Sequence, residues 1–161
     1  MIRLTINKNQ KFWQKVEAEG KQHGSSGIDY FVFNKGLWKS LPDFIIGRPG
    51  YDNWLIWNAR CRHIPVIDIS NIVYAIHQNH DYRVYTDPKL FPDPDSRANK
   101  KLHGANTLNL LDANYHFVNG KIEEKGTKEF INRNLGKLPI IFPEFSIPLT
   151  LYKKLYRKYL L

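Results

Sequence analysis

An aspartate that directly follows a glycine-rich loop is the side chain in this sequence best suited to catalysis. Asp52 comes after the loop Gly47–Gly50 and stands at the start of a predicted helix that runs to Arg62. Two glycines leave room for a substrate to approach, and a helix start can hold a carboxylate in place, so Asp52 could serve as a general base. The alternative is that Asp52 only caps its helix by accepting the free N–H groups of the first turn.

A dense polar cluster, His77–Tyr82, follows a predicted strand. Neutral imidazole and carboxylate groups are typical ligands of first-row divalent metal ions. Because residues 77 and 80 of a continuous strand point to opposite faces, the spacing favours one metal ligand from this cluster over two. A pair of hydrogen-bonded histidines near the end of a strand is the alternative.

The spacing of apolar residues and turn residues predicts the elements that position these side chains. The predicted helices span residues 9–20, a short segment closed by Pro42, and residues 52–62, 95–102 and 149–160. The predicted strands span residues 28–33, 65–69 and 72–76. Tyr115 to Glu123, with Asn119-Gly120 at its centre, is predicted to form a hairpin.

Composition favours a folded domain with a basic C-terminal third. Hydrophobic residues make up 42% of the 161 residues and aromatic residues 14%, which is enough for a core. The net charge is +9, and residues 97–161 hold 12 of the 24 basic residues but only 5 of the 15 acidic ones. Such an excess can attract a membrane surface, a nucleic acid or an anionic substrate, or serve solubility alone. A nucleic-acid partner is disfavoured, because the basic residues do not alternate with aromatics as in known RNA or DNA motifs.

The cellular compartment is predicted from the lone cysteine and the hydropathy of the chain. No apolar run approaches the roughly 20 residues that span a bilayer, and Met1 to Asn7 lack the apolar core of a signal peptide. Cys61 has no second cysteine with which to form a disulfide, which suits a reducing compartment. We therefore expect a cytoplasmic protein.

The last residues predict a basic amphipathic helix, which divides the chain into a domain of residues 1–146 and a helix within residues 147–161. Between Leu149 and Leu160, leucines and tyrosines fall on one face, and lysines and an arginine fall on the other. Such a helix can lie on anionic lipid, which would bring the protein to the inner face of the membrane. Packing of its apolar face on the rest of the domain is the favoured alternative.

Five blocks of the sequence carry a recognisable pattern: Gly27–Phe33, Gly47–Leu55, His77–Tyr82 and, more weakly, Pro94–Leu102 and Thr107–Ala113. Together they resemble the C-terminal half of bacterial family 2-like glycosyltransferases over residues 10–118. The resemblance implies an α/β fold in which a mixed sheet is flanked by helices. This would be a partial nucleotide-diphospho-sugar transferase fold of the A type, with its active site at the strand ends.

The resemblance also implies roles for the residues around Asp52. Asp52 would deprotonate an acceptor hydroxyl. Arg48, Tyr51, Asn53 and Trp54 would line the acceptor pocket, where an aromatic face can pack on the C–H face of a sugar.

Donor binding is assigned by the same resemblance to His77, His80 and Asp29. His77 is the candidate ligand of the diphosphate or of a divalent metal ion, Mn²⁺ or Mg²⁺. The donor would be a nucleotide sugar, and the acceptor a glycan or a lipid-linked saccharide.

The sequence departs from this family on the donor side. Related enzymes bind the nucleotide with an N-terminal βαβ unit and the metal with an Asp-rich motif. Here one predicted helix precedes residue 28, and no Asp-x-Asp occurs before residue 52. We therefore expect the acceptor-side half of a glycosyltransferase, with a partner chain as one source of the donor-binding half. A non-catalytic carbohydrate-binding or partner-docking module is the alternative.

Overall fold

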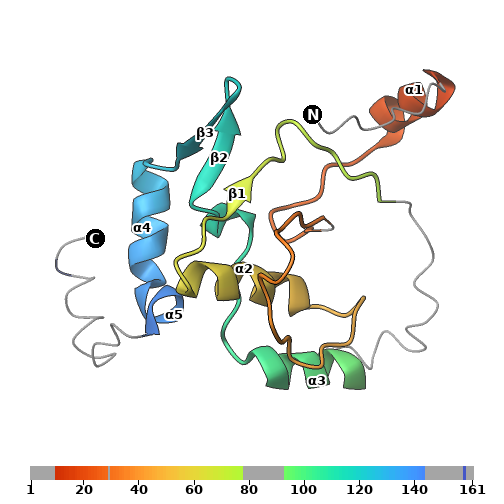
Figure 1. The fold of residues 1–161 in the computed structure, drawn as a ribbon. Helices are drawn as coiled ribbons and strands as arrows, with labels where there is room; N and C mark the ends of the chain where they lie inside the picture. Colours follow the sequence, from red (N-terminus) through yellow and green to blue (C-terminus); the bar gives the residue numbers. More distant parts are fainter. Residues whose placement is uncertain (1–9, 29, 78–92, 144–157, 159–161) are drawn as a thin grey trace.

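A computed structural model describes residues 10–28, 30–77, 93–143 and 158, and in this part of the chain it is mixed α/β (Figure 1). Within these described ranges, a small three-stranded mixed sheet is accompanied by five α-helices and the 3₁₀ turn η2. In chain order the elements are α1 (Gln10–Glu19), α2 (Tyr51–Cys61), β1 (Ile67–Asp68), α3 (Pro94–His103), η2 (Leu110–Asp112), β2 (Tyr115–Val118), β3 (Lys121–Glu124), α4 (Lys128–Gly136) and α5 (Leu138–Ile141).

The sheet has the order β1-β2-β3 and contains both kinds of strand pairing. β1 is parallel to β2, with Ile67 opposite Tyr115, and β2 is antiparallel to β3, with Val118 opposite Lys121. Asn119 and Gly120 connect β2 to β3 with φ angles of 49° and 79°. Positive φ at both central residues is what a two-residue hairpin turn requires, and Asn-Gly meets this requirement at low cost. The predicted hairpin is therefore confirmed.

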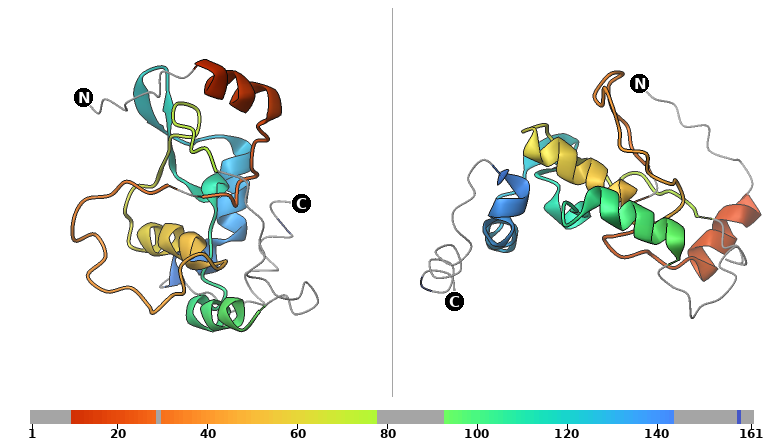
Figure 2. Two further views of the ribbon diagram at one scale, coloured as in Figure 1. Left: turned by 90° about the vertical axis from the view of Figure 1, so that its right-hand side faces the viewer. Right: turned by 90° about the horizontal axis from the view of Figure 1, so that it is seen from below.

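Helix α2 occupies the centre of the structure, between the sheet and α3 (Figures 1 and 2). The buried core joins segments that lie far apart in the sequence, because it is formed by Ile28, Ile56 of α2, Leu108 and Ile141 of α5. The indole Nε1 of Trp57 donates to the carbonyl of Ile140 over 2.6 Å, which fixes α5 against α2. Helix α1 has no buried residue and projects away from the rest (Figure 1).

Three predicted helices are confirmed, with ends within two residues of those expected. They are α1, α2 and α3, and the sequence signals for the last two are visible in the structure. Asp93 is the N-cap of α3 and accepts hydrogen bonds from the N–H groups of Asp95 and Ser96, while Pro94 occupies the first turn. Gly104, with a φ of 59°, is the C-cap residue, two residues beyond the predicted helix end at residue 102.

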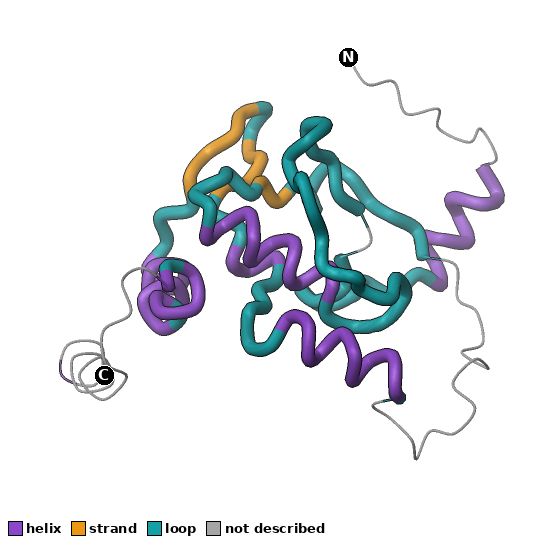
Figure 3. The backbone as a smooth tube through the Cα atoms, turned by 60° about the horizontal axis from the view of Figure 1, so that its bottom comes forward, coloured by secondary structure: helices purple, strands orange, loops and turns teal. Residues whose placement is uncertain are grey.

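The strands predicted at residues 28–33 and 72–76 are wrong for the described residues, which are irregular there (Figure 3). Strand β1 ends at Asp68, whose carboxylate accepts the Ser70 N–H and begins a turn. The carbonyl of Ile69 then accepts the N–H groups of Ile72 and Val73, so the chain reverses instead of continuing the strand. Without a neighbouring strand, a β-branched run has no partner for its backbone N–H and C=O groups.

The short helix predicted before Pro42 is also wrong, because turns replace it. The carbonyl of Leu37 accepts a hydrogen bond from the guanidinium of Arg62, and the indole of Trp38 donates to Asn58 of α2. These contacts with α2 and the residue after it anchor the segment. A helix is hard to nucleate in so short a stretch, so these contacts take the place of helical hydrogen bonds. The predicted helix 149–160 lies outside the described residues, apart from Lys158.

The carboxylate of Asp112 is completely buried and is surrounded by donors from η2 and α4. It accepts hydrogen bonds from Arg133 at 2.6 and 3.0 Å, from Lys137 Nζ at 2.8 Å and from the backbone N–H of Asn109 at 2.9 Å. Burial alone would raise the pKa of Asp112, but the hydrogen bonds from Arg133, Lys137 and Asn109 outweigh it. The pKa therefore lies below its ordinary value. This ionised group holds α4 against the rest of the fold.

The substitution Asp112→Asn should lower the free energy of unfolding by about 3–5 kcal/mol at pH 7, because it leaves two cations without their carboxylate. Since the folded pKa is depressed, the stabilisation is present above the unfolded pKa of about 3.9 and is lost as the pH falls through the folded value. The difference between wild type and variant in urea unfolding should therefore shrink below about pH 4. Asp43→Asn, at an exposed site, is the matched control. A difference that stays constant with pH would contradict this account of Asp112.

Candidate functional site

The start of α2 is built by two glycines with left-handed backbone conformations. Gly47 has a φ of 80°, and Gly50, the N-cap residue, has a φ of 105°. Side chains other than glycine rarely adopt such angles, so these positions explain the glycine-rich loop found in the sequence. Asp52 lies in the first turn of the helix that follows.

The side chain of Asn99, in α3, binds the backbone of this loop. Its side chain is fully buried, and its Oδ1 accepts the Ile45 N–H at 2.8 Å. Its Nδ2 donates to the Ile45 carbonyl at 3.0 Å and lies 3.3 and 3.4 Å from the carbonyls of Pro49 and Arg48. One amide group therefore satisfies the backbone of a loop that is about 50 residues earlier in the chain.

His103, at the end of α3, lies directly against Gly50. A Cβ atom added to Gly50 would lie 2.5 Å from Cδ2 and 2.7 Å from Nε2 of His103, so only glycine fits without displacing the ring. Nδ1 of His103 is buried and has no hydrogen-bond partner among the described residues. Sequence reasoning missed His103. Its spacing of four residues from Asn99, which places both on one face of α3, is the signal that could have revealed it.

Arg48 ties the loop to the start of α3. Its Nε lies 3.5 Å from Oδ1 of Asp93 and 3.4 Å from Oδ2 of Asp95. A hydrogen bond from the Ser96 hydroxyl, together with the Ser96 and Asp95 N–H groups and the charge of Arg48, holds the pKa of Asp93 below its ordinary value. The carboxylate that faces Arg48 is thus ionised at neutral pH.

Asp52 is half-buried, and one of its oxygens accepts the Asn53 N–H at 2.8 Å. The structure therefore contains a first-turn contact of the kind that the capping alternative predicts, although the N-cap residue itself is Gly50. A carboxylate in the first turn is also stabilised by the partial positive charge of the helix start. The position of Asp52 is compatible with both roles.

The four predicted acceptor residues lie in different environments around Asp52. Tyr51 and Arg48 are half-buried. Asn53 is joined to Leu108, because its Nδ2 donates to the Leu108 carbonyl at 2.8 Å and its own carbonyl accepts the Leu108 N–H at 3.1 Å.

Trp54, the fourth of these residues, is only 8% exposed and packs inside the domain. Its ring centroid lies 5.4 Å from that of Phe44 and 5.9 Å from that of Trp57. It therefore supports the first turn of α2 from within, whereas its three predicted companions are less deeply buried.

The predicted donor side is only partly described. His77 is exposed, and its ring centroid lies 6.5 Å from that of His23. His80 and Asp29 lie outside the described residues. Within the described ranges, no group of three or more His, Cys, Asp or Glu side chains is arranged to hold a metal ion.

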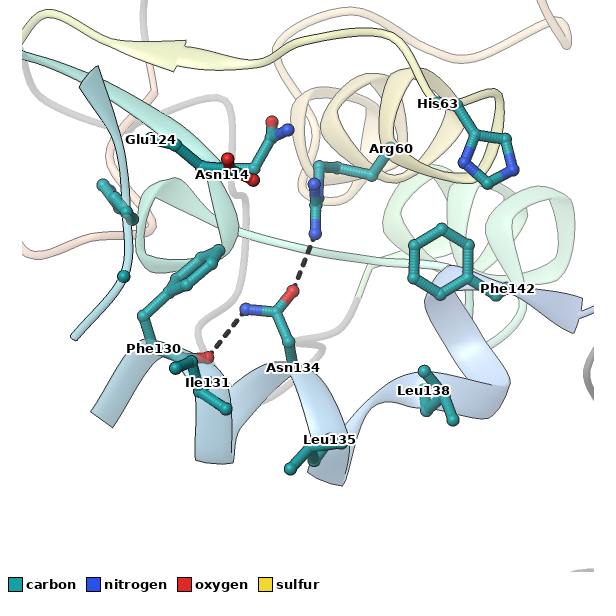
Figure 4. A pocket seen from close by; sticks show the side chains of 12 residues that line it. Arg60, His63, Asn114, Glu124, Phe130, Ile131, Asn134, Leu135, Leu138 and Phe142 are labelled. Carbon is teal, nitrogen blue, oxygen red and sulfur yellow. Dashed lines mark hydrogen bonds between the residues drawn. The ribbon is translucent and has the colours of Figure 1, made fainter. Parts of the chain in front are cut away.

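A pocket of about 730 Å³ opens at the other end of α2, between β3, α4 and α5 (Figure 4). None of the residues predicted as catalytic, acceptor-binding or donor-binding lines it. Its position depends on α4 and α5, two helices that the sequence analysis did not predict.

Comparisons with protein-family models, with curated proteins and with solved structures gave no match for this chain. Among the described residues, no helix has the length and apolar character needed to cross a membrane.

Replacing Asn99 by alanine should lower the free energy of unfolding by about 1–3 kcal/mol, because the partly buried backbone groups of Ile45 would lose their partner. Amide hydrogen exchange should also accelerate at Ile45 more than in the β2–β3 hairpin. Asn106→Ala, at an exposed position near the same helix, serves as the control for loss of an amide side chain. Equal stability of the two variants would show that Asn99 does not hold the loop.

Replacing Gly50 by alanine should cost about 1–2 kcal/mol from the left-handed backbone alone. It should also displace His103, whose ring occupies the space of the new methyl group. Combining it with His103→Ala should recover only the steric part of the loss, which a double-mutant cycle in urea unfolding measures. Gly24→Ala is the control, since a Cβ atom added to Gly24 would have no neighbour within 4 Å.

Proposed function

We propose that this chain is the acceptor-side part of a nucleotide-sugar glycosyltransferase with a partial A-type fold, in which Asp52 is the general base. The supporting observation is that three sequence blocks resembling this family lie against one another around the start of α2. Asn99 from one block approaches the carbonyls of Arg48 and Pro49 from a second. Leu108, from a third, exchanges two hydrogen bonds with Asn53.

In the proposed reaction, the Asp52 carboxylate takes the proton of an acceptor hydroxyl. The acceptor oxygen forms a bond to the anomeric carbon of the donor sugar, and the bond from that carbon to the diphosphate oxygen breaks. A positioned general base typically contributes about 10²–10⁴-fold to such a step. Asn99 and Gly50 contribute by fixing the loop and the helix start on which Asp52 is carried.

A divalent ion, Mn²⁺ or Mg²⁺, would supply charge stabilisation for the departing diphosphate. His77 is the described residue proposed to hold it, and the imidazole of His23 lies beside it, with the two ring centroids 6.5 Å apart. Two imidazoles do not complete a ligand set, so the other ligands would come from Asp29, His80 or a donor-binding partner chain. The proposed location is the cytoplasm or the inner face of the membrane, with residues 149–161 as the lipid contact.

A non-catalytic module that docks on a partner is the second candidate, and exposed apolar side chains favour it. Val32 is 81% exposed, Tyr30 76%, Ile46 73% and Tyr74 72%. A contiguous apolar patch marks a surface that contacts another protein, and these four side chains are the ones from which the proposed docking surface would be built. A missing donor-binding half would cover the same surface, so both candidates predict a partner and differ in whether transfer occurs.

The first experiment is thermal melting of the full chain with a panel of nucleotide sugars, with and without Mn²⁺. A ligand at about 100 times its Kd should add close to 3 kcal/mol, which raises the Tm by several degrees. A metal-dependent shift with one nucleotide is expected if the chain binds the donor itself. The same panel should be repeated with oligosaccharide acceptors, and failure to bind any saccharide or nucleotide sugar would contradict the proposal.

Asp52→Asn separates catalysis from docking. The variant should lose sugar transfer by about 10²-fold or more, measured as release of the nucleoside diphosphate, while its affinity for the acceptor stays close to that of wild type. Asp43→Asn makes the same chemical change at an exposed site and should retain full transfer. Transfer that survives in Asp52→Asn would exclude Asp52 as the base.

A further inference from the structure

The pocket at the C-terminal end of α2 has a polar side and an apolar side (Figure 4). Arg60, Glu124 and Lys125 contribute charged groups from α2 and the end of β3. Phe130 and Leu138, from α4 and α5, and Phe142 form much of the apolar side. Because α2 has 11 residues and rises about 1.5 Å per residue, this pocket and Asp52 occupy opposite ends of one helix.

Arg60 is the unusual group in this pocket. The residue is only 8% exposed, and its Nη2 donates to Oδ1 of Asn134 at 2.7 Å. Its Nε is buried and has no hydrogen-bond partner in the part of the chain that the structure describes. A guanidinium carries five N–H donors, and a buried donor without an acceptor is costly.

Burial lowers the pKa of Arg60, although attraction to Asp112, Glu124 and Tyr115 acts in the opposite direction. Asp112 is already matched by Arg133 and Lys137. No described carboxylate forms an ion pair with Arg60. The guanidinium is therefore a buried cation whose Nε–H lacks a partner among the described residues, and the residue lines an open pocket.

We propose that this pocket binds a small organic anion, a carboxylate or phosphate ester with an apolar body, through the guanidinium of Arg60. A guanidinium presents its donors in a planar fork that matches the oxygens of a carboxylate or a phosphate. The apolar body would pack on Phe130, Leu138 and Phe142. The site is separate from Asp52, so the proposal does not depend on the glycosyltransferase function.

The two other charges set the selectivity of the site. Lys125 is engaged elsewhere, since its Nζ lies 3.5 Å from Asp68 and 3.3 Å from the carbonyl of Leu110. Glu124 is exposed and lines the pocket, so it opposes a second negative charge. The site should therefore favour an anion with its charge at one end, and removal of the Glu124 charge should strengthen binding.

The test uses the ¹⁵N-labelled full chain and follows the Nε–Hε resonance of Arg60 by NMR. Phenyl phosphate is the probe, benzyl alcohol is the neutral comparison, and inorganic phosphate tests the need for an apolar body. We expect a saturable shift of the Arg60 resonance with phenyl phosphate, with binding at least about tenfold tighter than that of benzyl alcohol. Equal binding of the neutral compound, or an Arg60 resonance that does not move, would overturn the proposal.

Two neighbouring glutamates provide the matched variants. Glu124→Gln should tighten the binding of phenyl phosphate by about threefold, as expected for removal of a nearby like charge in a solvent-exposed setting. Glu123→Gln makes the same change on the opposite face of β3, outside the pocket lining, and should leave the affinity unchanged. Identical affinities for wild type and both variants would contradict an anion site at Arg60. Because Glu124 is exposed, this comparison does not require a substitution of the buried arginine.

Discussion

The buried carboxylate of Asp112 is the interaction on which the C-terminal part of the structure depends. It joins η2 to α4 through Arg133 and Lys137, and α4 in turn presents Asn134 to Arg60 of α2. A buried charge is tolerated only where donors surround it, so the position of α4 is determined by electrostatic matching as well as by apolar contact. The pocket beside α4 exists because this helix is held in place by that matching.

At the opposite end of α2, neutral amides act beside the contacts of Arg48 with Asp93 and Asp95. Asn99 supports the loop before the helix, and Asn53 joins the first turn to Leu108. Amide groups both donate and accept, so one side chain can satisfy several backbone groups of an irregular loop. A loop fixed in this way can leave a neighbouring carboxylate, such as Asp52, partly exposed without losing its own conformation.

Local signals in the sequence predicted the elements that depend on local chemistry. Asn119-Gly120 specified the hairpin, whereas the cap that Asp93 forms at the start of α3 was not among the signals used. Helix α4 was missed, although Thr127 caps it by accepting the Phe130 N–H. The segments at 28–33 and 72–76 were assigned as strands from their composition alone, but strand formation requires a neighbouring strand that no local pattern reveals.

The residues of the candidate site also fall into two groups: those that local sequence signals identified and those that they missed. Arg48, Tyr51, Asn53 and Trp54 were assigned to the site because they fall in the block Gly47–Leu55, on which the family resemblance rests. The contacts made by Asn99 and His103 were missed because they join residues that lie far apart in the sequence.

The core is shared by segments that lie far apart in the sequence, and this also constrains how the protein folds. The Trp57–Ile140 and Arg60–Asn134 hydrogen bonds span 83 and 74 residues, whereas the hairpin closes over two. Chain-closure entropy disfavours such long-range contacts early in folding. The core needs Ile28 and Ile56 from one segment and Leu108 and Ile141 from the other. Neither segment therefore has a complete core around which to fold alone.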